Sequence, residues 1–422
     1  MKQIIATLLI MMLIVTTACG ANQTKPKPDN NKDESIMSTK QPTGLIINAR
    51  TNFAFSLYPQ VLQEQKDENI FVSPVSIMLA LMMAYNGSDG ETQAAMETAL
   101  QLGEASLEEL NQANQALIQA MERSDESVKL QIANSMWGRE GITFDESFMD
   151  RIQDYYHAEI QSLDFDQPEA TETINQWVSD QTNDKIKNIV GDKISSDATL
   201  FLINAIYFNG KWEMPFDPKL TEDDVFTKVD STTKQHPYMN QNGKFKYYQE
   251  DTFQAVALPY GDGNTSMYVF LPDEASSLQD FHEQLTADNW TTWLSGFQER
   301  KGGVALPKFK LEGELELKKS LSAMGMGVAF EDGKADFSKI IADHASGPGL
   351  FISSIKHKTY VDVHEEGTEA AAVTSIEVSV TSLNTNEPEP FMMKVDRPFF
   401  IVIRDNQTNA ILFMGSIYEP QL

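Results

Sequence analysis

The sequence predicts an α+β fold, with helices concentrated in the first half of the chain and strands in the second. Before about residue 200, apolar residues recur mainly at helical spacing, as in 46–63. After about residue 225, short apolar segments separated by turn residues predominate, as in 254–259 and 265–271. The apolar segment 200–208 fits a central strand that is buried on both faces. Helices and strands segregated in this way along a chain are typical of α+β proteins.

The individual elements follow from the same periodicities. Ser73 and Pro74 are typical of a helix start, as N-cap and first-turn residue, and a short strand is predicted just before them. We expect helices at 46–63, 77–85, 91–100, 107–123, 145–156, 170–183, 278–285 and 315–324. We expect further strands at 129–137, 159–165, 200–208, 245–248, 254–259, 265–271, 303–307, 399–404 and 411–415. Turn residues at 261–264 and 405–409 predict two hairpins.

The composition is that of a long globular chain with a strong acidic excess. The 422 residues are 41% hydrophobic, which allows a large core to form without disulfides. The net charge of −28 argues against binding to nucleic acid, because a basic excess is needed to displace counterions from the phosphate backbone. We therefore expect no nucleic-acid partner.

The start of the chain predicts export. Lys2 is followed by an apolar run at 4–15 that is too short to span a bilayer, and small residues precede Cys19. This segment resembles a bacterial lipoprotein signal, in which Cys19 becomes the lipidated first residue, although Thr16 stands where that pattern usually has leucine. The alternative is an ordinary signal peptide cleaved after Ala18, which leaves a free thiol at the new N-terminus.

The chain is expected to divide into a signal peptide at 1–18, a disordered polar tether at 19–43 and a single globular domain at 44–422. Such a tether suits a domain that a lipid anchor holds at a membrane surface. We therefore expect an extracellular or cell-surface location. Cys19 is the only cysteine, so the domain is expected to have neither an intrachain disulfide nor a cysteine-based metal site.

Sequence motifs of the common enzyme classes are absent. The sequence has no nucleophile elbow, no glycine-rich phosphate-binding pattern and no zinc-protease helix motif. His357 and His364 form only a weak metal-ligand pair. The segments 261–264 and 222–224 are interpreted as a hairpin turn and a solvated acidic face rather than as ion sites. We therefore expect no enzymatic activity, no metal and no cofactor.

The stretch from Glu365 to Thr381 combines features of a loop with those of a strand. It begins with acidic residues and contains Gly367, which allows the backbone to bend sharply. An alternating pattern follows, and one of its faces carries no charge: Thr368, Ala370, Ala372, Thr374, Ile376, Val378 and Val380. The polar segment 384–390 that comes next is typical of an exposed loop. A strand pattern that leads into such a loop requires an explanation.

Several sequence blocks, in order from about residue 44 to residue 420, together resemble the serpin family of protease inhibitors. They are NIFVSPVS at 69–76, NGSDGET at 86–92, INQWV at 174–178, TNDKI at 182–186, NAIYFNGKW at 204–212, LPKF at 306–309, DRPFF at 396–400 and ILFMG at 411–415. The resemblance implies a serpin fold, in which helices of the N-terminal half pack on a large central β-sheet, with smaller sheets and an exposed reactive-centre loop. It also implies a target serine protease as partner, held in a covalent acyl complex.

In that family, the stretch that matches this loop-like strand is the hinge of the reactive-centre loop. After a protease cuts the loop, the hinge inserts into the central sheet as a new strand and carries the protease with it. The resemblance implies these hinge residues: Glu365, Gly367, Thr368, Glu369, Ala370, Ala371 and Ala372. The uncharged face starts with small residues, which can slide between existing strands with little overpacking. Val373 falls on the other face, so the hinge favours an inhibitory serpin.

Counting along the loop from Gly367, as the family does, places the scissile bond at Thr381–Ser382. The segment after this bond is longer than is usual in the family. The neighbouring bonds Val380–Thr381 and Ser382–Leu383 therefore stay open as alternatives.

The residue before the scissile bond indicates the class of protease. Thr381 is small and β-branched, which favours elastase-like or subtilisin-like serine proteases. A trypsin-like target is disfavoured, because no lysine or arginine lies between Tyr360 and Lys394.

The resemblance also gives roles to five residues outside the loop. Four of them match the polar shutter under the central sheet, where strands must part: Ser73, Ser76, Asn204 and His357. Trp212 matches the breach, where insertion begins. The alternative interpretation is structural, with His357 a hydrogen-bonded core histidine and Trp212 an ordinary core aromatic.

The leading hypothesis is a monomeric, surface-anchored bacterial serpin that traps extracellular serine proteases as a suicide substrate. A second hypothesis is a non-inhibitory serpin that acts as a binding or chaperone-like module. A third is a lipid-anchored solute-binding protein, which would suit the tether but would explain neither the block at 204–212 nor the hinge.

Overall fold

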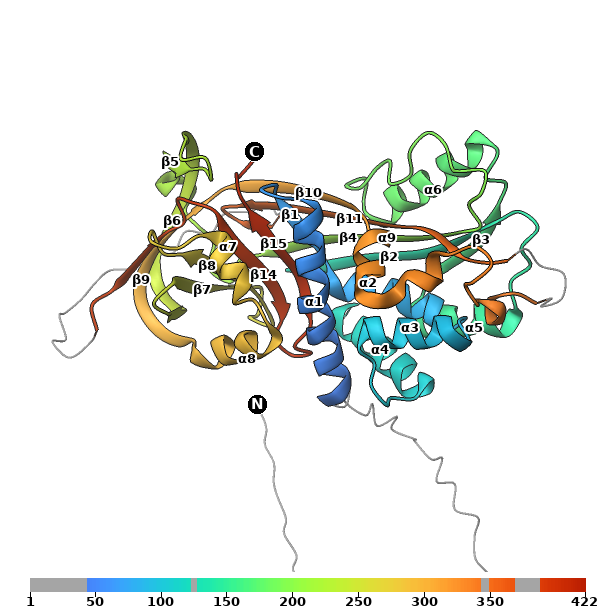
Figure 1. Ribbon diagram of the computed structural model, residues 1–422. Coiled ribbons are helices and arrows are strands. Elements are labelled where there is room, and N and C mark those ends of the chain that lie inside the picture. Colours follow the sequence, from blue (N-terminus) through green and yellow to red (C-terminus); the bar gives the residue numbers. More distant parts are fainter. Residues whose placement is uncertain (1–43, 123–126, 343–348, 369–387) are drawn as a thin grey trace, which may run out of the picture. The chain divides into compact units, whose positions relative to one another are not determined.

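The computed structural model describes residues 44–122, 127–342, 349–368 and 388–422 (Figure 1). The expected signal peptide, the tether and Cys19 therefore lie outside the described residues. The helices predicted from apolar spacing in the first half of the chain are present, and the second half is mostly strands, so the α+β prediction is confirmed.

Most of the helices precede residue 182. Their bounds are α1 Gly44–Glu64, α2 Pro74–Tyr85, α3 Gly90–Leu100, α4 Leu107–Glu122, α5 Glu146–Tyr156, α6 Pro168–Gln181, α7 Leu278–Glu283, α8 Ala287–Gly296 and α9 Lys318–Leu321. Short 3-10 or π turns lie at Pro218–Leu220, Ser322–Met326, Gly327–Phe330 and Ser338–Ile340. The predicted start of α2 is confirmed, because the Ser73 side chain accepts a hydrogen bond from the Ser76 backbone N–H and Pro74 occupies the first turn.

The strands form two sheets. Their bounds are β1 Ile70–Val72, β2 Val128–Arg139, β3 Glu159–Leu163, β4 Leu200–Lys211, β5 Glu222–Thr227, β6 Thr233–Gln249, β7 Phe253–Tyr260, β8 Thr265–Pro272, β9 Gln298–Pro307, β10 Phe309–Glu316, β11 Ile352–His364, β12 Gly367–Thr368, β13 Phe391–Lys394, β14 Phe399–Asp405 and β15 Ile411–Ile417. The six-stranded sheet has the order β10-β11-β12-β4-β2-β3. The nine-stranded sheet has the order β1-β15-β14-β8-β7-β6-β9-β13, with β5 paired to β6.

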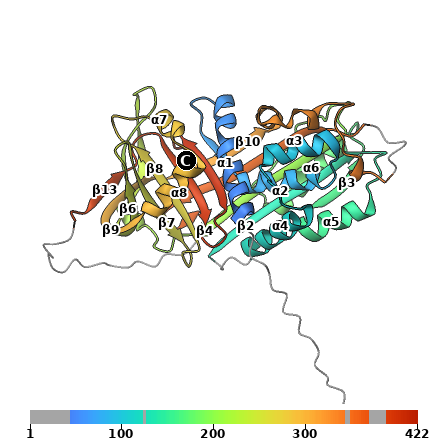
Figure 2. The same cartoon turned by 60° about the horizontal axis from the view of Figure 1, so that its bottom comes forward.

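Helices cover both faces of the six-stranded sheet. In Figure 1, α2 to α5 lie on one side of β2 and β4, and α6 lies on the other. Figure 2 shows the helices of the first side in front of the sheet, with α7 and α8 beside the nine-stranded sheet. Helices on both faces explain the burial of the central strand. Every residue of β4 from Leu200 to Phe208 is buried, as the apolar run predicted.

Two hydrophobic clusters fill the interior. The larger one joins α1 and α2 to both sheets, and the almost wholly apolar α2 lies inside it. The smaller one lies between α6 and the sheet, where Ile174 and Val178 of α6 meet Ile203 and Tyr207 of β4. A large part of the six-stranded sheet is therefore packed on both faces.

Some predicted elements are wrong in extent. The helix expected at 315–324 starts three residues later than predicted, because Leu315 and Glu316 end strand β10; from Lys318 the chain is helical, first as α9 and then as the π turn Ser322–Met326. The alternating burial along β10 explains why a period of two describes this segment better than a helical period. Sequence inspection also missed α8, although its buried Trp290 and Trp293 have helical spacing.

Among the helices of the described ranges, none has both the length and the apolarity needed to cross a bilayer.

Candidate functional site: the hinge and the shutter

The first residues of the predicted hinge already form a strand. β12 consists of Gly367 and Thr368 and lies between β11 and β4, antiparallel to both. Thr368 pairs with Val363 on one side and Gly210 on the other, and it is fully buried. Its hydroxyl forms a 2.9 Å hydrogen bond with the Tyr260 hydroxyl. The stretch that combined loop and strand features therefore begins as a strand inside the sheet.

Gly367 is required where β12 enters the sheet. Its φ angle is +148°, a backbone conformation that residues other than glycine rarely adopt. A Cβ atom at this position would lie 2.1 Å from the Gly210 carbonyl oxygen and 2.6 Å from the Lys211 Cα atom. The glycine therefore allows both the turn and the close approach of the two backbones.

Glu365 attaches the hinge to Lys308, which connects β9 to β10, and to Thr221, which precedes β5. Its carboxylate forms a 2.9 Å ion pair with the Lys308 ammonium and accepts a 2.8 Å hydrogen bond from the Thr221 hydroxyl. Burial opposes the charge of this carboxylate, but these hydrogen bonds outweigh burial and hold the pKa of Glu365 below its usual range. The Phe216 backbone N–H also donates to the Glu365 carbonyl oxygen at 2.8 Å.

Trp212 lies where the chain enters the hinge. Its indole Nε1–H donates to the His364 carbonyl oxygen at 2.9 Å, and its backbone N–H donates to the Glu366 carbonyl oxygen at 3.0 Å. The indole stacks on the Tyr260 ring with centroids 4.2 Å apart. Trp212 and Tyr260 thus contact the backbone before Gly367 and the side chain after it.

Away from β12, the two strands β4 and β11 pair with each other directly. This seam runs in parallel from Leu200 opposite Ile352 to Tyr207 opposite Tyr360. The sheet is therefore open to a third strand at one end of the β4–β11 pair and closed along the rest.

The four predicted shutter residues meet at this closed seam. Asn204 of β4 lies opposite His357 of β11, and its side-chain oxygen is 2.5 Å from His357 Nδ1. The Ser73 backbone N–H donates to His357 Nε2 at 3.0 Å. The Asn204 side-chain amide donates to the Ser76 carbonyl and hydroxyl oxygens at 3.0 and 2.5 Å. All four residues are buried, so they form one interior network across the seam and the start of α2.

The network holds His357 neutral. Because Nε2 accepts the Ser73 N–H, the ring proton lies on Nδ1 and is donated to Asn204. Desolvation by burial lowers the pKa of His357 to about 3, although the hydrogen bond to Asn204 acts in the opposite direction. A second ring proton would point at the Ser73 N–H, so protonation requires the network to break.

Sequence inspection missed two residues of this site. Asn134 of β2 lies opposite Asn204 and accepts a 2.5 Å hydrogen bond from its amide. Tyr260 contacts both Thr368 and Trp212. An asparagine inside the strand predicted at 129–137 was a usable signal for Asn134, because buried strand positions rarely hold an unpartnered amide. Nothing in the sequence around Tyr260 distinguished it from other core tyrosines.

Several predicted site residues lie outside the described part of the chain. They are Glu369, Ala370, Ala371, Ala372, Thr381, Ser382 and Cys19. Within the described residues, no group of three or more histidine, cysteine, aspartate or glutamate side chains could hold a metal ion. His357 and His364 have separate surroundings, since His364 Nδ1 accepts a hydrogen bond from the Glu366 N–H.

Comparison with known proteins identifies the family. Residues 48–420 match the family model described as "Serpin (serine protease inhibitor)". The chain belongs to the serpin family. This match confirms the predicted family, and the solved structures described below confirm the predicted fold. Members of the family are generally protease inhibitors rather than enzymes.

Relatives occur in distant organisms. Human Serpin B3 is 35% identical over 396 residues, which cover 89% of this chain and 99% of Serpin B3. A serpin-like protein of the archaeon Methanosarcina acetivorans is 32% identical over 99% of this chain and 98% of its own length.

Solved serpin structures have the same fold. The thermophilic serpin tengpin in its native state superposes with a TM-score of 0.81 at 33% identity, over 88% of this chain and 94% of tengpin. Human thyroxine-binding globulin, solved with thyroxine, gives the same TM-score at 28% identity, over 89% of this chain and 99% of the globulin.

Proposed function

We propose that this serpin is a suicide-substrate inhibitor of serine proteases that acts by inserting its cut reactive-centre loop into the six-stranded sheet. The protease serine would attack the Thr381 carbonyl, release the amino group of Ser382 and remain esterified to the new C-terminus. The observation that carries the proposal is β12, which already occupies the open end of the β4–β11 pair. Insertion would then extend an existing strand rather than start a new one.

The register of β12 supports this extension. Thr368 pairs with Gly210 and Val363, so residues that follow in the same register would descend one position along each strand per step. Ala370 would then lie opposite Phe208 and Val361, and Ala372 opposite Ile206 and Thr359. The two alanines would then face the larger hydrophobic cluster, which contains Ile206 and Phe208, and their small side chains would add a strand there with little overpacking.

The same register would bring Thr374 to the shutter. It would lie between Asn204 and His357, which a third strand must move apart by about one strand spacing, roughly 4.8 Å. The threonine hydroxyl can accept the His357 Nδ1–H and donate to the Asn204 side-chain oxygen, so both buried groups would keep partners. The reactive loop would thus replace the hydrogen bond that its own insertion breaks.

The sequence after the shutter position supports a favourable end state. Ile376 would lie between Leu202 and Ile355, both fully buried. Full burial of an isoleucine or valine side chain contributes roughly 1.5–3 kcal/mol, and Val378 follows on the same face. This burial would favour the cleaved, inserted state over the intact protein.

The proposed target class rests on Thr381. Its small β-branched side chain suits the primary specificity pocket of elastase-like or subtilisin-like proteases. The proposed setting is extracellular, as a monomer held at a membrane through a lipid on Cys19. The support for this setting is the apolar run before Cys19 and the polar tether after it.

The test is a reaction with a panel of elastase-type, subtilisin-type and trypsin-type proteases. We expect a complex that survives boiling in detergent with the first two classes, and a released C-terminal fragment that begins at Ser382. Digestion of the loop by every enzyme in the panel, with no covalent complex, would overturn the proposal.

A hinge variant provides the matched control. Thr368→Arg places a long cation at a fully buried position between two strands, where it cannot be accommodated without loss of pairing. The variant should still be cut by the same proteases but should act as a substrate, with no stable complex.

The alternative function is ligand binding without inhibition. The observation that favours it is the likeness to thyroxine-binding globulin, a serpin solved with a small ligand. Under this alternative, cleavage of the loop would leave the thermal stability of the protein unchanged.

A further inference from the structure

The chain passes from one sheet to the other at Lys308. This residue alone separates Pro307 at the end of β9, in the nine-stranded sheet, from Phe309 at the start of β10, in the six-stranded sheet. Its ammonium forms the ion pair with Glu365 in the hinge. We call this connection at Lys308 the corner. Its position determines where the Lys308 ammonium, which pairs with the Glu365 carboxylate, lies.

β6 holds the corner on one side. The Lys308 backbone N–H donates to the Pro237 carbonyl oxygen at 3.0 Å. His236 Nε2 lies 2.5 Å from the Lys308 carbonyl oxygen and donates to it, since a carbonyl can only accept. His236 is buried, so this hydrogen bond is shielded from water.

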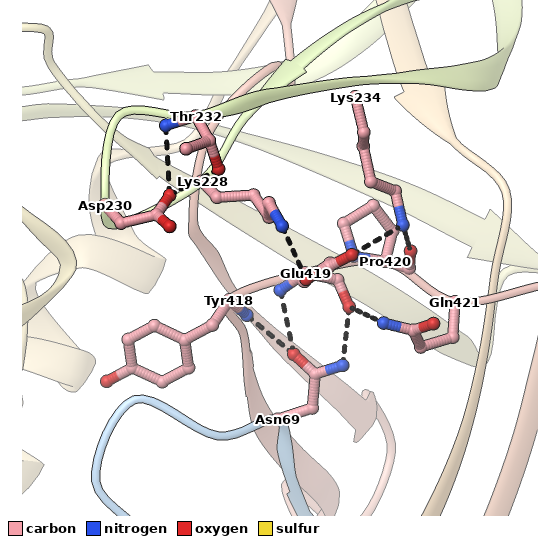
Figure 3. Close-up of polar contacts among 9 residues, drawn as sticks. All are labelled: Asn69, Lys228, Asp230, Thr232, Lys234, Tyr418, Glu419, Pro420 and Gln421. Atoms are coloured by element: carbon pink, nitrogen blue, oxygen red, sulfur yellow. Dashed lines mark hydrogen bonds and ion pairs between the residues drawn. The ribbon is translucent and has the colours of Figure 1, made fainter.

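The C-terminal segment 418–421 holds the corner on the other side. The Lys310 backbone N–H donates to the Gln421 carbonyl oxygen at 2.8 Å. The segment is fixed in turn by Asn69, whose side-chain oxygen accepts from the Tyr418 and Glu419 N–H groups at 2.7 and 3.0 Å (Figure 3). Asn69 also donates to the Glu419 carbonyl oxygen at 2.6 Å.

Two lysines complete the attachment of this segment to β6 and to the β5–β6 turn. Lys234 donates to the Pro420 carbonyl oxygen at 2.6 Å and lies 3.1 Å from the Glu419 carboxylate (Figure 3). Lys228 lies 3.4 Å from the other oxygen of that carboxylate. Lys234 and His236 are two positions apart on β6, so one strand carries both the contact to the C-terminal segment and the contact to the corner.

We propose that Lys234, His236 and Glu419 are positioning residues for the hinge. They hold the Lys308 corner between β6 and the C-terminal segment, and the corner holds Glu365 through its ion pair. Loss of any of the three loosens the corner and lets β12 leave the sheet more often. This inference rests on the proposed role of β12 as the start of loop insertion.

The test is backbone hydrogen exchange of the segment 363–368, measured by mass spectrometry on the full chain. Glu419→Gln and Lys234→Met should each speed exchange of this segment about three- to fivefold, the size expected for a partly exposed ion pair. His236→Leu should have a larger effect, about tenfold, because it leaves the Lys308 carbonyl without its donor. Lys234→Arg should restore slow exchange, since it keeps the charge.

The control uses a different ion pair of β6, which joins it to β9 rather than to the C-terminal segment. Lys244 and Glu299 lie 2.9 Å apart at exposed positions and do not contact the corner. Lys244→Met should leave exchange of 363–368 unchanged, and none of the variants should alter exchange of the β14–β15 hairpin. The proposal is overturned if Glu419→Gln matches the control, or if exchange rises equally throughout the protein. Because the readout needs no protease, it stays informative if the proposed inhibitory function fails.

Discussion

The hinge and the shutter, two regions of the β4–β11 pair, are built in opposite ways. At the hinge, the strands stand apart, β12 fills the gap, and an ion pair from Lys308 supports the entry. At the shutter, the strands pair directly, and a neutral, fully buried network around Asn204 joins them to α2. The Lys308–Glu365 ion pair is partly exposed and can be exchanged for water, whereas the shutter contacts are buried and cannot. Under the proposed function, this difference predicts that insertion starts at the hinge and that the shutter sets most of its barrier.

The largest effect is expected at the shutter. Asn204→Leu removes an amide that serves Asn134, Ser76 and His357, and it leaves several buried polar groups without partners. We expect the free energy of unfolding to fall by about 3–5 kcal/mol. Chemical denaturation measures the change. A loss below 1 kcal/mol would show that the network does not hold the seam.

The second-largest effect is a different dependence of stability on pH at the shutter and at the hinge. The pKa of His357 is about 3 in the folded protein, below its ordinary value of 6.5, so the unfolded chain binds more protons between these values. Stability from the shutter is therefore complete above pH 6.5 and falls as the pH drops, by about 2 kcal/mol at pH 5. The ion pair of Glu365 behaves differently, because the pKa of that carboxylate lies below its ordinary value of 4.5. Its contribution is kept down to about pH 4.5 and lost below it.

Denaturation between pH 7 and pH 5 checks this prediction. Burial also lowers the pKa of His282, to about 4, so this residue adds to the same slope. The part that belongs to the shutter should disappear in His357→Gln and remain in His282→Gln. A slope that is the same in wild type and His357→Gln would contradict the assignment.

A smaller effect is expected at the hinge entry. Gly367→Ala adds a Cβ atom that would lie 2.1 Å from the Gly210 carbonyl oxygen, so β12 should be displaced. The cost to stability should be about 1–2 kcal/mol, since only the entry is strained. Hydrogen exchange should show loss of protection in 363–368 without loss around His357. Equal loss in both regions would break the distinction between them.

The smallest effect is expected for the hinge ion pair. Glu365→Gln keeps the hydrogen bond from Thr221 but removes the charge that pairs with Lys308. The Lys308 side chain is 29% exposed, so solvent screens the pair and the loss should be about 1 kcal/mol or less. Lys308→Met should give a similar value, and the double variant should add little to either. Full additivity in this double-mutant cycle would show that the two side chains do not interact.

The sequence allowed the fold and part of the site to be predicted, for different reasons. Periodicity alone indicated the helices and the buried strand at 200–208. Ser73, Asn204 and His357 are far apart in the sequence, so only the resemblance to a family could bring them together. Alternation correctly indicated that Thr368 belongs to a buried face.

Other features depend on tertiary contacts that no local pattern encodes. The entry of β12 into the sheet depends on the close approach of Gly367 to Gly210, on a strand more than 150 residues away. The corner at Lys308 is held by His236 and by the C-terminal segment, and neither has a distinctive sequence motif. The roles of Gly210, His236 and the C-terminal segment become evident only from the three-dimensional arrangement of the strands.

Under the proposed function, the segment after Thr368 becomes a strand of the six-stranded sheet once it is cut. The most direct test is the thermal unfolding midpoint before and after a single cleavage within 369–387. Burial of Ile376 and Val378, at roughly 1.5–3 kcal/mol each, should raise the midpoint by about 4–8 °C in a domain of this size, and backbone pairing of the new strand should add to this rise. An unchanged midpoint after complete cleavage would contradict the claim.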